Sequence, residues 1–263
     1  MPAYLDKIIG AHRAEASFDH RDVEELVELA VAAPPARSFV GAIEKASAQR
    51  GMAVISEIKR RSPSKGDLDP TLDPAVVAVD YELGGATCLS VLTDREFFGG
   101  SVEDLRLARE ACALPVLRKD FTVSGRDVCD ARLMGADAVL LIVAALTDDE
   151  LADFLSVARR CSLAALVEVH DAVELHRALD AGADVIGVNQ RDLRTFEVDH
   201  HRALTLGAAI PTEICRVAES GIKGGEDVRR LAEAGYQAVL VGETLVRSGD
   251  RRAAVGQLLS SPS

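Results

Sequence analysis

Eight short apolar runs follow one another along the chain, and each precedes a segment in which apolar residues recur with helical spacing. The run Ala138–Val143 is apolar throughout, as is typical of a parallel sheet that is buried on both faces. Eight strands that alternate with eight helices predict a (β/α)8 TIM barrel, a fold of the α/β class. The expected strands are about 52–59, 86–92, 115–118, 137–143, 164–169, 184–189, 214–219 and 237–241. The expected helices are about 74–83, 101–111, 125–134, 147–160, 171–181, 199–208, 224–234 and 251–260.

A glycine recurs between predicted helices and the strands that follow them, at Gly85, Gly135, Gly182 and Gly235. Glycine ends helices readily because it adopts the left-handed conformation without a Cβ clash. These glycines are 50, 47 and 53 residues apart, which corresponds to two βα units per repeat. An open doubly wound sheet is the alternative architecture. It is disfavoured because no glycine-rich dinucleotide-binding turn follows the first strand.

Residues 1–50 precede the first predicted strand and are expected to form a helical N-terminal extension. Val23, Leu26 and Val27 lie on one apolar stripe, and Pro34-Pro35 would end the helix that carries them. The pattern leaves open whether this extension covers the floor of the barrel or its mouth. No Gly/Ser/Pro-rich linker divides the chain, so residues 1–263 are predicted to form a single domain.

Composition limits the classes of function. A net charge of −12 argues against binding to nucleic acid or to an anionic membrane, because both need a basic surface. The longest strongly apolar stretch, Ala138–Leu146, is too short to span a membrane, and Met1–Glu15 lacks the apolar core of a signal peptide. We therefore expect a cytoplasmic enzyme. If its substrate is an anion, the positive field that binds it must be local.

The cysteines and histidines predict neither a metal site nor a disulfide framework. The five cysteines are odd in number, widely spaced and without a C-x-x-C pair. His170 lies two residues beyond Glu168, but no third ligand is obvious. We therefore expect structural thiols and no bound metal.

Several predicted strands end in a charged or amide residue. The carboxyl ends of the strands of a parallel barrel meet at one mouth, so these residues are expected to share a pocket. Glu57 and Lys59 are two residues apart on the first strand, which projects both side chains to the same side. A buried ion pair is the alternative interpretation. The cation-rich loop 60–66 that follows would suit an anion.

Lys119 ends the third predicted strand and would bring a second ammonium group into this mouth. Neighbouring lysines lower each other's pKa, and a nearby Glu57 would offset that effect and leave a lysine available as an acid. Glu168 ends the fifth strand, where burial is expected to raise its pKa towards that of a useful general base. An ordinary salt bridge at the strand end is the alternative for Glu168.

Three further segments follow the last three strands. Asn189 and Arg191 follow the sixth, and a guanidinium there suits bidentate binding of a carboxylate, although a surface ion pair is the alternative. Glu219–Ile222 and Val241–Thr244 follow the seventh and eighth, where barrel enzymes frequently bind phosphate through loop amides and a short helix. The charge of Glu243 would repel phosphate, so any contact there is assigned to its backbone N–H.

Together these features resemble the indole-3-glycerol-phosphate synthase family. Ser56–Lys59 running into Ser62–Gly66 is similar to the signature of that family, and other stretches are similar to it in order and spacing. The resemblance covers essentially the whole chain after residue 50 and is looser before it. The other stretches are Leu89–Asp94, Phe97–Ser101, Pro115–Phe121, Leu166–Val169, Ile186–Arg191, Thr195–Glu197, Ala218–Ile222 and Leu240–Glu243.

The resemblance implies an enzyme of tryptophan biosynthesis that needs no metal or organic cofactor. Its small phosphorylated substrate would be 1-(2-carboxyphenylamino)-1-deoxyribulose 5-phosphate, whose indole ring the enzyme closes with release of carbon dioxide and water. Lys119 would be the acid that polarises the ribulose carbonyl, and Glu168 a base in later proton transfers. Lys59, oriented by Glu57, would bind the substrate and act in the dehydration. The supporting catalytic positions would be Asn189 and Ser220.

The resemblance also implies which residues bind the substrate. The anthranilate carboxylate would bind Arg191, and the anthranilate ring would lie against apolar side chains. The phosphate would bind at the last two loops, opposite the ring. The implied residues are Phe98, Phe121 and Leu140 for the ring, and Gly221, Gly242, Glu243 and nearby Ser62 for the phosphate.

Two rival classes stay open. Another phosphate-binding barrel, such as a sugar-phosphate isomerase, would account for the last two loops but not for two lysines with Glu57. A catalytically silent binder of a phosphorylated ligand is the rival outside the enzymes. Formation of an indole product would separate both from the first interpretation. The sequence predicts neither the protein partners nor the oligomeric state.

Overall fold

The strands form a closed parallel barrel. The computed structural model describes residues 4–63, 65–192 and 195–260, so Ser64 of the predicted anion loop lies outside the described residues. Neighbouring strands follow the order β1-β10-β9-β8-β7-β6-β5-β4 and pair in parallel throughout. The predicted TIM barrel is therefore confirmed, and the open sheet is excluded. The strands are β1 (Ala53–Ile58), β4 (Cys88–Leu92), β5 (Val116–Lys119), β6 (Ala138–Ile142), β7 (Ala164–Val169), β8 (Val185–Asn189), β9 (Cys215–Glu219) and β10 (Ala238–Val241).

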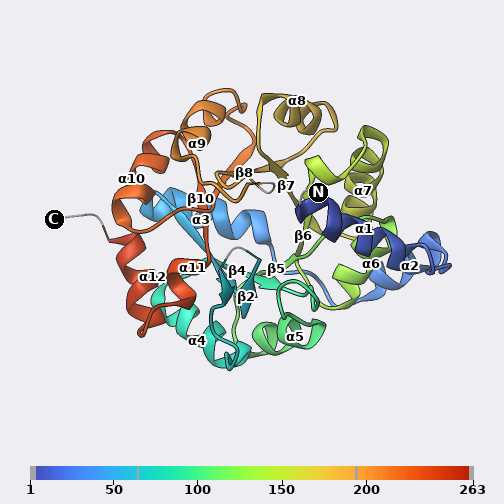
Figure 1. Ribbon diagram of the computed structural model, residues 1–263, viewed down its shortest axis with the longest axis horizontal. Coiled ribbons are helices and arrows are strands. Elements are labelled where there is room, and N and C mark those ends of the chain that lie inside the picture. Colours follow the sequence, from blue (N-terminus) through green and yellow to red (C-terminus); the bar gives the residue numbers. More distant parts are fainter. Residues whose placement is uncertain (1–3, 64, 193–194, 261–263) are drawn as a thin grey trace.

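A ring of helices surrounds the barrel (Figure 1). Their bounds agree with the predicted segments to within a residue at most ends. All four of the recurring glycines have positive φ, between 76° and 99°, as the helix-exit interpretation requires. The ring consists of α4 (Pro74–Gly84), α5 (Val102–Ala111), α6 (Gly125–Leu133), α7 (Asp148–Arg160), α8 (Ala172–Asp180), α9 (His200–Gly207), α10 (Gly225–Glu233) and α12 (Arg251–Leu259).

Local sequence explains where these helices begin. Thr147 and Glu150 form a capping box at the start of α7, in which each side chain binds the backbone N–H of the other residue. Ser124 and Asp127 do the same for α6. Four short elements were not predicted individually. They are an antiparallel hairpin of β2 (Arg61–Ser62) and β3 (Gly66–Asp67), the 3-10 helix η1 (Val143–Ala145), and α11 (Glu243–Val246).

The strands divide the core into two layers by the alternation of their side chains. One set packs outward against the helices, and the other fills the barrel interior. In β1, for example, Ala53 and Ile55 belong to the interior cluster, whereas Val54 and Ile58 belong to the outer one. The barrel interior is filled with apolar side chains. Inward-facing polar residues are therefore expected at the mouth, where the strands end.

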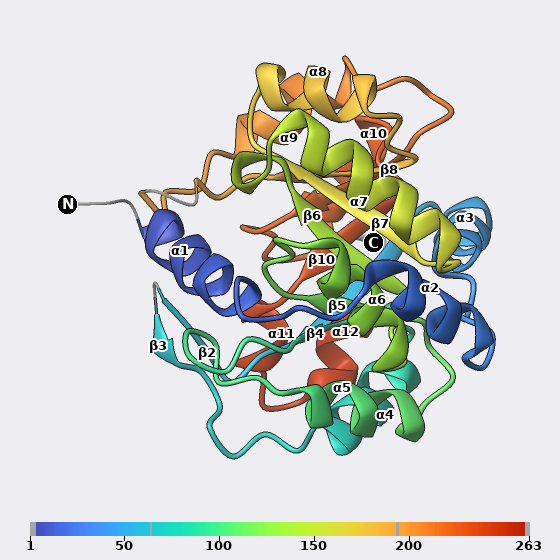
Figure 2. The same cartoon turned by 90° about the vertical axis from the view of Figure 1, so that its right-hand side faces the viewer.

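The N-terminal extension covers both ends of the barrel. Its helices are α1 (Tyr4–Ala16), α2 (Val23–Ala32) and α3 (Phe39–Arg50), and α3 lies at the end opposite α1 (Figure 2). Phe39 and Ile43 of α3 join the interior cluster and close the floor. At the mouth, Leu5 and Ile8 of α1 line the central cavity. Both positions that the sequence left open are therefore occupied, by different helices.

Two other expectations concern the cysteines and membrane-spanning helices. All five cysteines are free and buried, as expected for structural thiols. Over the described residues, no helix has both the length and the apolar surface needed to cross a bilayer.

Candidate active site

A cavity of about 620 Å³ opens at the carboxyl ends of the strands. Every one of the predicted catalytic and binding residues lines it, so segments up to 186 positions apart meet in one space. The helix α1 and the loop between β2 and β3 also contribute to its wall. The predicted residues in the wall are Glu57, Lys59, Ser62, Phe98, Lys119, Phe121, Leu140, Glu168, Asn189, Arg191, Ser220, Gly221, Gly242 and Glu243.

Lys119 lies at the centre of the polar groups. It ends β5, and its Nζ donates to Glu168 Oε2 at 3.0 Å and to Glu219 Oε2 at 2.7 Å. Burial alone would lower the pKa of Lys119, but the charges of Glu168, Glu219 and Glu57 outweigh burial and raise it. The ammonium form is therefore stable across the neutral range, and Lys119 is available as a proton donor.

The expected rise in the Glu168 pKa is wrong. Burial does raise the pKa of this carboxyl, but Lys119, His170 and a hydrogen bond from Asn189 together lower it below its ordinary range. The Nδ2 of Asn189 donates to Glu168 Oε1 at 3.1 Å. Burial alone does not set this pKa, because the tertiary structure places cations beside the carboxylate. Glu168 is thus an ionised base in the substrate-free protein.

Glu219 is the functional candidate that the site prediction missed. It ends β9, its side chain is buried, and burial together with the neighbouring Glu168 charge raises its pKa to about 7, although Lys119 opposes this. Its Oε1 has no hydrogen-bond partner and lies where a Cβ on Gly187 would be. The glycine in β8 therefore makes room for this carboxyl. The strand alternation could have revealed Glu219, because it has the same parity as the inward-facing Cys215 and Val217.

Glu57 and Lys59 form an ion pair, which was the alternative interpretation of their spacing. Glu57 is buried, and both residues line the cavity. A Cβ on Gly242 would overlap Glu57 Oε1, so the glycine after β10 allows the carboxylate to lie there. The buried ion pair and the catalytic interpretation are thus compatible, because the pair lies in the cavity wall.

An apolar wall stands on one side of the mouth. The rings of Phe98 and Phe121 have centroids 6.1 Å apart, and Leu140 of β6 lies in the same cavity. Leu5 and Ile8 of α1 add apolar side chains to the lining of the same cavity. The surface is suited to an aromatic ring, which buries its faces against apolar side chains.

The opposite side of the mouth consists of the loops after β8, β9 and β10. Ser220 and Gly221 both have positive φ, 66° and 73°, and Thr244 Oγ1 donates to the Ile222 carbonyl at 2.8 Å. Barrel order places β9 four strands from β5, which is directly across the mouth. The Nη2 of Arg191 is 3.8 Å from Glu243 Oε2, so its guanidinium lies on this side and not beside the apolar wall.

The mouth is locally more positive than the protein as a whole. Six basic and five acidic side chains line the cavity, whereas the whole chain has a net charge of −12. This satisfies the requirement for a local positive field. The basic residues are Lys59, Lys65, Lys119, Arg191, Lys223 and Arg247. The acidic residues are Glu57, Asp120, Glu168, Glu219 and Glu243.

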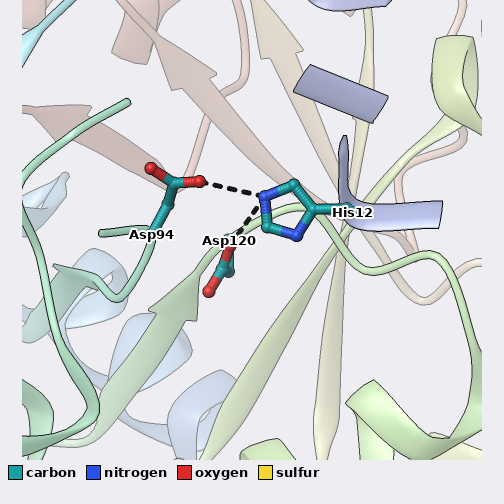
Figure 3. Close-up of side chains that lie close together, drawn as sticks. All are labelled: His12, Asp94 and Asp120. Carbon is teal, nitrogen blue, oxygen red and sulfur yellow. Dashed lines mark hydrogen bonds and ion pairs between the residues drawn. The ribbon is translucent and has the colours of Figure 1, made fainter. Parts of the chain in front are cut away.

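One cluster among the described residues has donors of the type that could ligate a metal: His12, Asp94 and Asp120 (Figure 3). The Nε2 of His12 is 2.9 Å from Asp94 Oδ2 and 3.8 Å from Asp120 Oδ1. Arg118 Nη2 already donates to Asp120 at 3.0 Å, and the backbone N–H of Phe121 donates to its other oxygen. A guanidinium so close opposes a second cation, so we interpret the cluster as an ion pair that attaches α1 to the barrel.

Comparison with known proteins identifies the family. The model of the family described as indole-3-glycerol phosphate synthase matches residues 5–258. The chain belongs to the indole-3-glycerol phosphate synthase family. An indole-3-glycerol phosphate synthase of Kineococcus radiotolerans is 52% identical over 240 residues, which cover 91% of this chain and 88% of the relative. Another, of Rhodococcus jostii, is 46% identical over 259 residues, 98% of this chain and 95% of that protein.

Solved structures agree with the fold. A tryptophan synthase subunit alpha from Legionella pneumophila superposes with a TM-score of 0.62 at 15% sequence identity. The match covers 84% of this chain and 96% of that one. At this identity the likeness supports the barrel architecture alone. The assignment to the indole-3-glycerol phosphate synthase family rests on the family match and the relatives.

Proposed function

We propose that this protein is an indole-3-glycerol phosphate synthase that acts in tryptophan biosynthesis. Its substrate is 1-(2-carboxyphenylamino)-1-deoxyribulose 5-phosphate, and its products are indole-3-glycerol phosphate, carbon dioxide and water. One observation carries the proposal beyond family membership. Lys119 and Lys59, each paired with carboxylates, lie between an apolar wall and the loops after β9 and β10.

In the first step, the ring carbon that bears the anthranilate carboxylate attacks the ribulose carbonyl carbon. The carbonyl π bond breaks, and its electron pair takes the proton of Lys119. The pKa of Lys119 is raised in the free protein, but the alkoxide that forms is a stronger base than an amine. An ammonium fixed beside the carbonyl also stabilises the negative charge that develops there.

The later steps restore the aromatic ring. Loss of carbon dioxide returns the electron pair of the carboxylate bond to the ring. The new hydroxyl then takes a proton from Lys59, which Glu57 orients, and leaves as water. Glu168 accepts the proton that the neighbouring CH2 carbon loses as the new ring double bond forms. Asn189 holds Glu168 through its amide, and Ser220 supports the site from the loop after β9.

Binding across the mouth brings the reacting carbons together. The anthranilate ring lies against Phe98, Phe121 and Leu140, and the phosphate binds opposite. Arg191 binds the anthranilate carboxylate. Fixing both ends of a flexible chain reduces the entropic barrier to ring closure. The phosphate-binding residues are Ser62, Gly221, Gly242 and Glu243, the last through its backbone N–H.

The proposal extends to the context of the reaction. The overall change needs no oxidant or reductant, so acid–base groups suffice and we propose no metal or organic cofactor. Residues 1–263 act as one domain, because α1 and α3 complete the mouth and floor of the same barrel. We place the protein in the cytoplasm, where charged phosphorylated metabolites are retained.

Indole fluorescence tests the proposal directly. Wild-type protein mixed with the substrate is expected to form product, and Lys119→Met to reduce kcat by about 100- to 10,000-fold, the usual contribution of a general acid. Lys45→Met on α3 is the matched control, because Lys45 is exposed at the other end of the barrel. Folded wild-type protein without product would disprove the function. Full activity in Lys119→Met would disprove the assignment of the acid.

Arg191 requires a separate test, because its guanidinium lies on the phosphate side. If it binds the anthranilate carboxylate, Arg191→Met weakens inhibition by anthranilate about tenfold or more and leaves inhibition by glycerol 3-phosphate unchanged. The reverse pattern would reassign Arg191 to the phosphate.

A further inference from the structure

His170 lies beside Glu168, the proposed base. It follows β7 by one residue, and its Nε2 is 3.4 Å from Glu168 Oε1. Its Nδ1 is 3.0 Å from Glu174 Oε2 on α8, and its backbone N–H donates to the same oxygen at 2.7 Å. A carboxylate can only accept, so Nδ1 carries a hydrogen and the ring orientation is fixed. Glu174, His170 and Glu168 are therefore connected in series, by a hydrogen bond and then an ion pair, and the series ends at the active site.

The Nε2 atom of His170 is buried and has no hydrogen-bond partner of its own. Nε2 is within hydrogen-bond distance of Glu168 Oε1, but the two groups are not aligned for a hydrogen bond, so their attraction is that of an ion pair. A buried polar atom without a partner is unfavourable, and a small movement of Glu168 would satisfy it. The other carboxylate oxygen, Oε2, binds Lys119. Glu168 thus has a basic group beside each oxygen, Lys119 at Oε2 and His170 at Oε1.

Charged groups from three elements face the imidazole. Burial lowers the pKa of His170, but the Glu174 hydrogen bond and the charges of Glu168 and Glu174 raise it overall, against a weaker opposing effect of Arg202 on α9. Arg202 donates to the Asn189 carbonyl at 3.1 Å. The surroundings of His170 therefore favour the imidazolium form, and its charge faces Glu168.

We propose that His170, anchored by Glu174, is a positioning residue that keeps Glu168 ionised and oriented while Lys119 gives up its proton. The inference rests on the proposed function, in which Lys119 becomes a neutral amine during ring closure. At that point Glu168 loses one of its two neighbouring cations. Without the second, the buried carboxylate would take up a proton and could not serve as a base in the later steps.

The pH profile of kcat/KM for indole formation tests this role. We compare wild type, His170→Asn and Glu174→Gln, with His176→Asn as the matched control. His176 lies on α8 with 77% of its side chain exposed, and its neighbour Asp180 is also exposed. Thermal unfolding of each variant establishes that it is folded.

The acidic limb of the profile is the decisive readout. Loss of a cation beside Glu168 raises the pKa of the carboxyl, so His170→Asn is expected to move this limb upward by about 1 to 3 pH units. On the acidic limb, kcat/KM of His170→Asn is therefore expected to be at least about tenfold below that of wild type. The two profiles converge at high pH, where His170 is neutral in the wild type. Glu174→Gln moves the limb in the same direction by less, because the ring keeps its place.

The outcomes separate the two proposals. Wild-type protein without product would contradict the proposed function and not the local geometry. An active wild type with an unshifted limb in folded His170→Asn would overturn the positioning role, even if kcat fell uniformly. If His170→Asn does not fold, Glu174→Gln decides: a limb that matches the His176→Asn control overturns the inference, and an upward shift supports it.

Discussion

Replacing Glu219 by glutamine tests how the buried carboxyls set stability. The wild-type carboxyl is buried, one of its oxygens lacks a hydrogen-bond partner, and its pKa is raised to about 7 from an ordinary value of 4.5. The amide of Glu219→Gln has nearly the same shape and never ionises. The variant therefore removes the cost of a buried charge and leaves the space beside Gly187 filled.

The magnitude follows from the raised pKa. A rise of about 2.5 units, at about 1.4 kcal/mol per unit, corresponds to about 3 to 4 kcal/mol of folding free energy. Because the pKa of the folded state is the higher one, this stability is fully present below about pH 4.5 and is lost as the pH rises through about 7. Glu219→Gln does not titrate there, so its stability relative to wild type should increase by about 3 kcal/mol between pH 4.5 and pH 8.

Urea unfolding at pH 4.5, 6 and 8 measures the difference. Glu233→Gln on α10 is the matched control, because 63% of the Glu233 side chain is exposed and little change with pH is expected. Activity should fall in Glu219→Gln even where stability rises, since Lys119 loses its nearer carboxylate. A stability difference from wild type that stays constant over this pH range would refute the burial argument.

Two further predictions concern the walls of the cavity. Gly242→Ala places a methyl group against Glu57, so kcat for indole formation should fall about tenfold or more as Lys59 loses its partner; unchanged kcat would contradict this interpretation. His12→Gln tests the attachment of α1, because the hydrogen bond to Asp94 and the Asp120 charge raise the pKa of His12 against the opposing effect of burial. The stability it contributes is present below about pH 6.5 and is lost at higher pH, so the variant should lower the melting temperature more at pH 6 than at pH 9; an equal loss at both values would count against the ion pair.

The strand pattern predicted most of the site because a parallel barrel has a simple geometry. Glu57, Lys119, Glu168 and Asn189 each face inward at the end of a strand, so the order of the strands is enough to place them in one cavity. The same rule applied to β9 selects Glu219, which the resemblance did not supply. Whether a strand residue faces inward or outward depends only on its position along that strand, so its orientation can be obtained from the sequence.

The state of each ionisable group could not be obtained in this way. Glu168 was expected to have a raised pKa and has a lowered one, whereas its neighbour Glu219 has the raised value. The difference depends on ångström-scale distances to Lys119 and His170, which belong to other segments of the chain. The side of the mouth on which Arg191 lies was likewise set by the conformation of its loop.

The sequence by itself determined the order of the eight barrel strands and of the eight helices around them, because hydrophobic periodicity, helix caps and glycine exits act over a few residues. It also determined which residue types reach the mouth. Only the tertiary structure decided that α1 covers the mouth while α3 closes the floor, and that two buried glutamates share one lysine. Those outcomes depend on packing and electrostatic contacts between residues as far as 137 positions apart, such as Arg13 and Glu150, which no local pattern encodes.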